Sequence, residues 1–137
     1  MAASSRQPWL RAAILVGIVY FLIGRLFAIP ADHVHAWRLA AWLVSGVVYA
    51  AHIGYEHFRL RNSPRVTASH VALAVAIGAM ALAVAGMIHS LTTRRAIRPI
   101  WLLALVAWPV MTALPAFLGA LVAAAVLPKP AIRENAE

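Results

Sequence analysis

Cysteine is absent from this chain of 137 residues. Its absence excludes disulfides, thiolate metal sites, iron–sulfur clusters and thiol nucleophiles. Acidic residues are almost as scarce, since the chain holds only 4 of them. They are Asp32, Glu56, Glu134 and Glu137. Chemistry that needs a pair of carboxylates, such as glycoside hydrolysis, is therefore poorly supplied.

Charge of either sign is also limited, because only 12% of the residues are charged while 64% are apolar. A soluble domain has about 25% charged and about 45–50% apolar residues, so this composition is not that of a water-soluble fold. The net charge of +8 comes from Lys and Arg residues at the ends of apolar blocks. Such residues contact lipid headgroups and set topology. We therefore expect the lipid bilayer as partner, and no nucleic acid.

The apolar residues form four long blocks, each with roughly the 20 residues that a helix needs to cross about 30 Å of hydrocarbon. Short polar links join them, and Ser63-Pro64 predicts a helix start, with serine as the N-cap and proline in the first turn. Short links make consecutive helices antiparallel neighbours. The sequence predicts an all-α integral membrane protein, a four-helix up-down bundle that forms a single domain over 1–137 with short polar termini. The expected spans are 10–29, 37–57, 69–89 and 100–127.

Positive residues are more numerous on the side of the membrane that holds the two termini and the second link, which places this side in the cytoplasm. The expected location is a cell membrane, taken as a bacterial inner membrane. The terminus-bearing side carries Arg6, Arg11, Arg59, Arg61, Arg65, Lys129 and Arg133. The opposite side carries Arg25, Arg38, Arg94, Arg95 and Arg98.

The second block has a polar stripe whose members are spaced four, three, four and three residues apart, which places them on one face of a helix. Polar groups in a membrane helix seldom face lipid, so the stripe should point into the bundle or toward a partner. The stripe consists of Ser45, Tyr49, His52, Glu56 and Arg59.

Small residues occupy the adjoining stripe of the same block, at Gly46, Ala50 and Gly54. This spacing lets a second helix approach closely. We therefore expect the second helix to be the central packing element. The alanine-rich block 69–89 predicts a smooth, closely packed wall with little chemistry of its own.

His52 and Glu56 lie one helical turn apart, and this pair is suited to a proton relay, a cation site or a carboxylate that orients a ligating imidazole. The alternative is a structural hydrogen bond in which Glu56 also pairs with an arginine. Arg11, Arg59 and Arg61 lie at the right end of the bundle for that contact.

Two histidines from two helices at similar depth are what a membrane b-type haem requires. His52 and His70 meet this condition, and they are the candidate haem or metal ligands. On the other side of the membrane, Arg25 either extends to the lipid headgroups or forms an anion contact with His89 and Arg98. In the fourth block, Pro109 and Pro115 predict a kink.

No nucleophile–base set, no cofactor motif and no long loop points to catalysis. The leading interpretation is a small multi-pass membrane protein without catalysis, either an accessory or assembly subunit of a membrane complex or a homo-oligomer. The first alternative is a small transporter or channel with a polar path along the second helix. The second alternative is an electron-transfer anchor that holds haem b.

Overall fold

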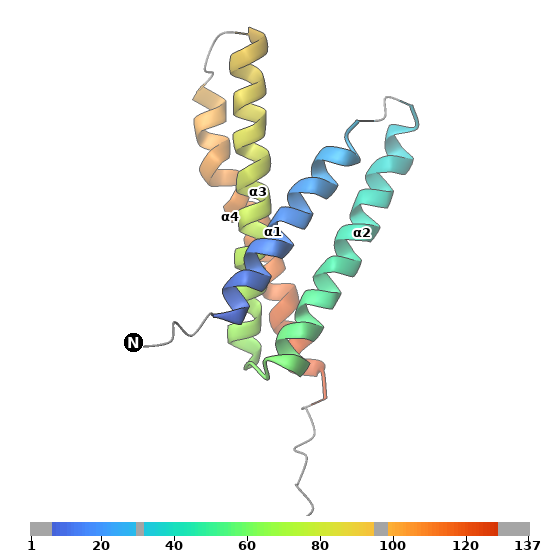
Figure 1. Ribbon diagram of the computed structural model, residues 1–137, viewed down its shortest axis with the longest axis vertical. Coiled ribbons are helices and arrows are strands. Elements are labelled where there is room, and N and C mark those ends of the chain that lie inside the picture. Colours follow the sequence, from blue (N-terminus) through green and yellow to red (C-terminus); the bar gives the residue numbers. More distant parts are fainter. Residues whose placement is uncertain (1–6, 30–31, 95–98, 129–137) are drawn as a thin grey trace, which may run out of the picture.

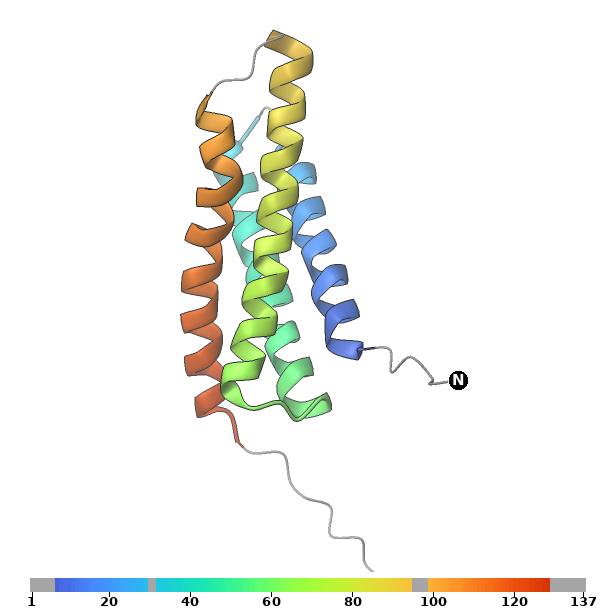
Figure 2. The same ribbon diagram turned by 90° about the vertical axis from the view of Figure 1, so that its left-hand side faces the viewer.

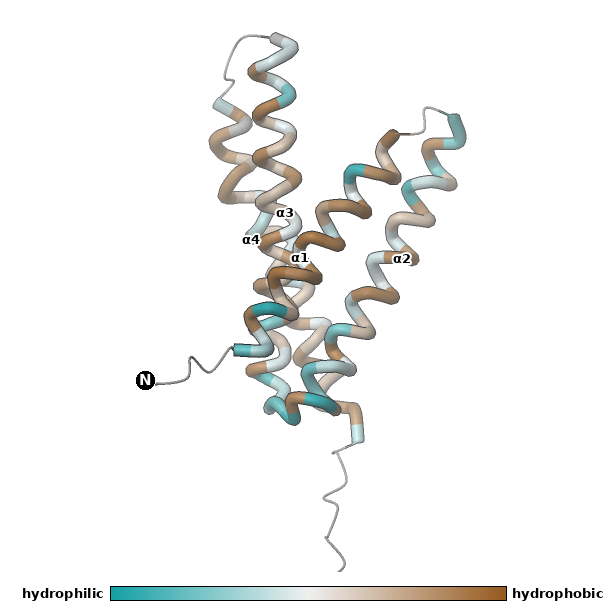
Figure 3. Tube along the Cα trace, viewed as in Figure 1, coloured by the Kyte–Doolittle hydropathy of each residue, from teal (hydrophilic) through white to brown (hydrophobic). Residues whose placement is uncertain are grey.

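The computed structural model describes residues 7–29, 32–94 and 99–128, and this part of the chain contains helices joined by short turns and no strand. Four helices follow one another: α1 (Pro8–Leu26), α2 (Val34–Gly54), α3 (Pro64–Arg94) and α4 (Pro99–Val126). All four are long and apolar enough to span a membrane. The all-helical, four-span architecture expected from the sequence is thus confirmed. Figure 3 shows apolar residues along the middle of the helices and hydrophilic ones toward their ends, including the turn between α2 and α3.

The helix boundaries follow local signals in the sequence. Pro8 and Pro64 each stand in the first turn of their helix, where the missing N–H costs nothing. The start of α3 at Pro64 confirms the interpretation of Ser63-Pro64. With 31 residues, α3 is longer than its expected apolar span. At 1.5 Å per residue its length is about 46 Å, more than the hydrocarbon core of a bilayer.

A short π-helix, η1 (Tyr55–Arg59), follows α2 directly. The N–H of Leu60 donates to the carbonyl oxygen of Tyr55 at 3.2 Å, which is the five-residue spacing of a π-turn. Arg61 then adopts the left-handed conformation with φ of 54°. The widened turn and this left-handed residue end the helix and reverse the chain toward α3.

The helices do not pack evenly. α3 lies between α4 and α1 and makes its main contacts with these two, whereas α2 touches the other helices much less. Figure 1 shows α1 and α2 diverging from α3 and α4 toward one end, and Figure 2 shows α3 in front of the other helices from a second direction. The expectation that the second helix is the central packing element is therefore wrong: α3 has that position, because its alanines and glycines let two helices approach it.

Two glycines allow the close approach of α1 and α3. A Cβ added at Gly78 would lie 2.6 Å from Cβ of Tyr20, and one added at Gly17 would lie 2.6 Å from Cγ2 of Ile77. Both distances are far below van der Waals contact. The two helices therefore meet through backbone and small residues, the arrangement that stabilises helix pairs in membranes.

Candidate functional site: a buried histidine–carboxylate cluster

Glu56, in η1, is completely buried. Its Oε2 accepts a hydrogen bond from Nδ2 of Asn62 at 2.5 Å. Nδ1 of His70 lies 2.9 Å from the same oxygen. An ionised carboxylate can only accept hydrogen bonds, so Nδ1 of His70 carries the proton in this contact. The carboxylate is thus held by one residue of the turn and one residue of α3.

His52 stands one turn before Glu56, and its Nε2 lies 3.6 Å from Oε1 of Glu56. This distance suits an ion pair when the imidazole is protonated but is too long for a hydrogen bond. The His52 side chain is 1% exposed, and neither ring nitrogen has a hydrogen-bond partner among the described residues. Buried polar atoms without partners are costly, so an imidazole in this state is a candidate for binding or proton transfer.

The π-turn brings these side chains together. The N–H of Asn62 donates to the carbonyl oxygen of Glu56 at 3.2 Å, which folds the turn back on the carboxylate. α3 begins at Pro64, and His70 follows on its second turn. Single π-turns in α-helices occur frequently at functional sites.

Contacts around the cluster join it to the remaining helices. The indole of Trp9, on α1, stacks on the His70 ring with centroids 4.3 Å apart and planes inclined by 9°. Nε2 of His57, which is buried, lies 3.0 Å from the carbonyl oxygen of Pro128, just after α4. The cluster is therefore the place where all four helices are tied together.

The members of the predicted polar stripe differ in how deeply they are buried along α2 and η1. Ser45 and Tyr49 are half-buried, while Arg59 is exposed. The hydroxyl of Tyr49 donates to the carbonyl oxygen of Ala116 on α4 at 2.6 Å. His52 and Glu56 are the buried members. Within the described residues no arginine pairs with Glu56, so the expected arginine partner is replaced by Asn62 and His70.

Within the part of the chain that the structure describes, no helix packs closely against the small-residue stripe of α2. A Cβ at Gly46 would meet nothing within 4 Å, and one at Gly54 would meet only Phe58 in the following turn, at 4.0 Å. Ala50 is exposed. Gly46 lines a groove of about 770 Å³ that lies among all four helices, together with Tyr20, Ser45, Gly78 and Thr112.

The expected anion site on the opposite side includes a residue outside the described part of the chain, so it stays a prediction. Arg25 and His89 are both exposed, and Arg98 lies outside the described residues. Exposed arginines near helix ends can reach the headgroups with their long side chains.

The geometry gives little support to a haem or a metal at His52 and His70. Each imidazole faces a different oxygen of Glu56, so the carboxylate lies between them where a haem would need open space. Among the described residues no group of three His, Asp or Glu side chains is arranged to hold a metal ion.

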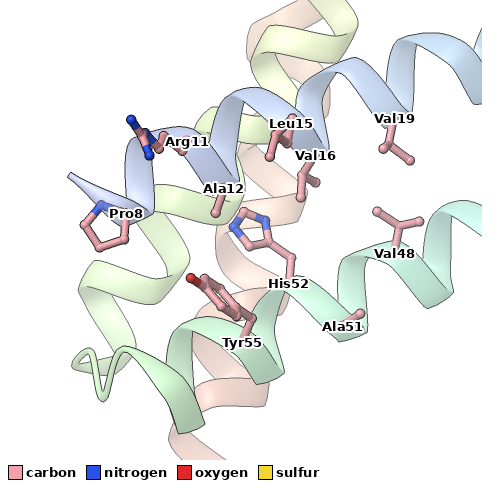
Figure 4. A pocket seen from close by; sticks show the side chains of 10 residues that line it. All are labelled: Pro8, Arg11, Ala12, Leu15, Val16, Val19, Val48, Ala51, His52 and Tyr55. Atoms are coloured by element: carbon pink, nitrogen blue, oxygen red, sulfur yellow. The ribbon is translucent and has the colours of Figure 1, made fainter. Parts of the chain in front are cut away.

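A second cavity, of about 540 Å³, lies between α1 and α2 and reaches His52. Figure 4 shows the His52 imidazole directed toward α1, with Arg11 at one end of the cavity and valines at the other. His52 thus stands between this cavity and Glu56.

Sequence reasoning missed Trp9 and Asn62 as parts of the site. Trp9 is typical of an interfacial aromatic belt and Asn62 of a turn. The sequence does contain one indication that they belong to the site: both are polar or amphipathic residues at the same end of the bundle as Glu56. Their pairing depends on the π-turn and on the approach of α1 to α3, which no residue pattern encodes.

Comparisons with protein-family models, with curated proteins and with solved structures find no match for this chain. Its function is therefore inferred from the geometry of its own residues.

Proposed function

We propose that this chain is a non-catalytic membrane subunit that assembles with further transmembrane helices through α2, either in a complex with another membrane protein or as a homo-oligomer. The observation that carries the proposal is the isolation of α2 within its own chain. This helix is tied to the rest of the chain at its Glu56 end and by the hydrogen bond from Tyr49 to α4, while Gly46 and Ala50 of its small-residue stripe have no described helix packed against them.

Lipid tails are as apolar as leucine, so membrane helices gain stability mainly by close packing and hydrogen bonds between helices. α1, α3 and α4 satisfy this requirement among themselves, because α3 packs closely against the other two. α2 does not, although Gly46 and Ala50 give it a surface that a helix can approach. A partner helix on this surface would supply the packing that the chain itself does not provide.

The proposal includes the location and orientation expected from the sequence. The chain resides in a cell membrane, taken as a bacterial inner membrane, with both termini in the cytoplasm. The greater number of Lys and Arg residues on the terminus-bearing side supports this orientation.

Single-cysteine variants test the assembly directly, because the native chain has no cysteine. In native membranes, Gly46→Cys should crosslink to a second copy or to another membrane protein, identified by mass spectrometry. Leu118→Cys, on α4 at a position that is 60% exposed, is the matched control and should crosslink much less. Equal, weak crosslinking at both positions would overturn the proposal.

A second candidate function is proton transport along α2. It is favoured by the burial of His52 and Glu56, and by the ring nitrogens of His52 and Oε1 of Glu56 that have no hydrogen-bond partner. Ionisable residues inside membrane segments often form proton relays. Proteoliposomes with an internal pH dye should show a proton flux that Glu56→Gln abolishes and Arg59→Gln leaves intact. No flux above that of empty liposomes would exclude this function.

A further inference from the structure

The cavity between α1 and α2 has an apolar wall and one polar end. Leu15, Val16 and Val19 of α1 face Val48 and Ala51 of α2 across it. From Arg11 to Val19 the wall extends about 12 Å along the helix at 1.5 Å per residue. The volume of the cavity, about 540 Å³, is within the usual range of small-molecule sites, about 300–1,000 Å³.

The polar end holds Arg11, His52 and Tyr55. Arg11 is exposed at the mouth, and among the described residues no carboxylate lies within ion-pair distance of it. His52 is 3% exposed and points into the cavity with both ring nitrogens unpartnered. A guanidinium and an imidazole at one end of an aliphatic channel are complementary to an amphipathic anion.

We propose that this cavity binds a single-chain lipid carboxylate, a fatty acid, with its carboxylate at Arg11 and His52, the first part of its chain along the valine-lined wall, and the rest of the chain extending beyond Val19 into the lipid. This site is additional to the assembly surface of α2, since the residues that form it face α1 rather than the small-residue stripe. Glu56 does not line the cavity, so His52 separates the ligand's charge from the buried carboxylate.

A single chain is the occupant that fits best. The cavity is bounded by two helices and has one aliphatic channel, whereas a diacyl lipid would leave its second chain outside it. The mouth lies near the start of α1, beside Trp9. Tryptophans are enriched at membrane–water interfaces, so we expect a fatty acid to enter there from the membrane.

Native mass spectrometry of the protein released from phosphatidylcholine nanodiscs tests the site with palmitate as the probe. We expect saturable binding of one palmitate per chain. Arg11→Gln and His52→Gln should each weaken it at least tenfold, because each removes a charged or hydrogen-bonding partner of the carboxylate. Arg65→Gln, at an exposed position outside the cavity, should leave the affinity unchanged.

Val48→Trp keeps the test independent of the histidine–carboxylate cluster. Its side chain should fill the channel and abolish binding, whereas Val47→Trp, at a neighbouring position that is 70% exposed, should not. Circular dichroism and elution volume establish that each variant is folded. Unsaturable palmitate uptake, the same affinity in all variants, or preferential binding of dipalmitoyl phosphatidylglycerol would each overturn the proposal.

Discussion

Trp9 stacks face to face on His70, with the ring centroids 4.3 Å apart, although the two residues belong to different helices. The same imidazole binds Oε2 of Glu56 through its Nδ1. Trp9 therefore fixes the plane of the ring that holds the buried carboxylate, and it links α1 to a cluster otherwise built from the end of α2, η1, the following turn and α3.

This link predicts that Trp9→Leu lowers the stability of the protein. Aromatic pairs contribute about 0.5–1.5 kcal/mol beyond the area they bury, so we expect a loss of about 1 kcal/mol in the free energy of unfolding in detergent. Trp42→Leu is the control, because Trp42 is 79% exposed and should face lipid. An equal loss in both variants would mean that the stack contributes nothing specific.

Asn62 and His70 should act on stability through the same carboxylate oxygen. Hydrogen bonds to charged groups contribute about 1.5–3 kcal/mol, so Asn62→Ala should cost about 2 kcal/mol. In the Glu56→Gln background the charge that strengthens this bond is gone, and Asn62→Ala should cost clearly less. The measurement is a double-mutant cycle of unfolding free energies in detergent. Additive costs would show that the bond between Asn62 and Glu56 is not coupled to the charge.

How far the sequence predicts this molecule can be judged at Glu56. The burial of a polar stripe follows from the cost of exposing such groups to lipid, and the spans follow from block length. The partners of Glu56 do not follow, because an ideal α-helix through residue 59 would not fold Asn62 back on the carboxylate. The π-turn and the left-handed Arg61 are local departures from an α-helix that the residue pattern does not predict.

The packing of α2 gives a similar lesson. The spacing of Gly46, Ala50 and Gly54 shows that a helix could approach there, but it does not identify the helix. Within this chain the close approach is made at Gly17 and Gly78, where the glycines of α1 and α3 face each other's helix. The spacing of small residues thus indicates that a helix can pack closely at that surface. Which helix packs there depends on the whole assembly.

The orientation in the membrane makes a separate prediction. A reporter fused after Glu137 and a cysteine introduced at Ser63, an exposed residue of the link between α2 and α3, should both lie in the cytoplasm. In intact cells an impermeant thiol reagent should leave Ser63→Cys unlabelled and should label it after lysis. Labelling in intact cells, together with an external reporter signal, would invert the orientation while keeping the four spans.

Two glycines of similar appearance in the sequence should respond in opposite ways to the same substitution. Gly78→Ala places a Cβ that would lie 2.6 Å from Cβ of Tyr20, so α1 and α3 must move apart, and overpacking of this kind costs about 1–3 kcal/mol. Gly46→Ala meets nothing within 4 Å in this chain. There the better helix propensity of alanine, about 1 kcal/mol, should leave the isolated chain as stable or more stable. Thermal unfolding of both variants in detergent compares them, and a loss of stability at Gly46 equal to that at Gly78 would show that α2 is packed as closely as α3.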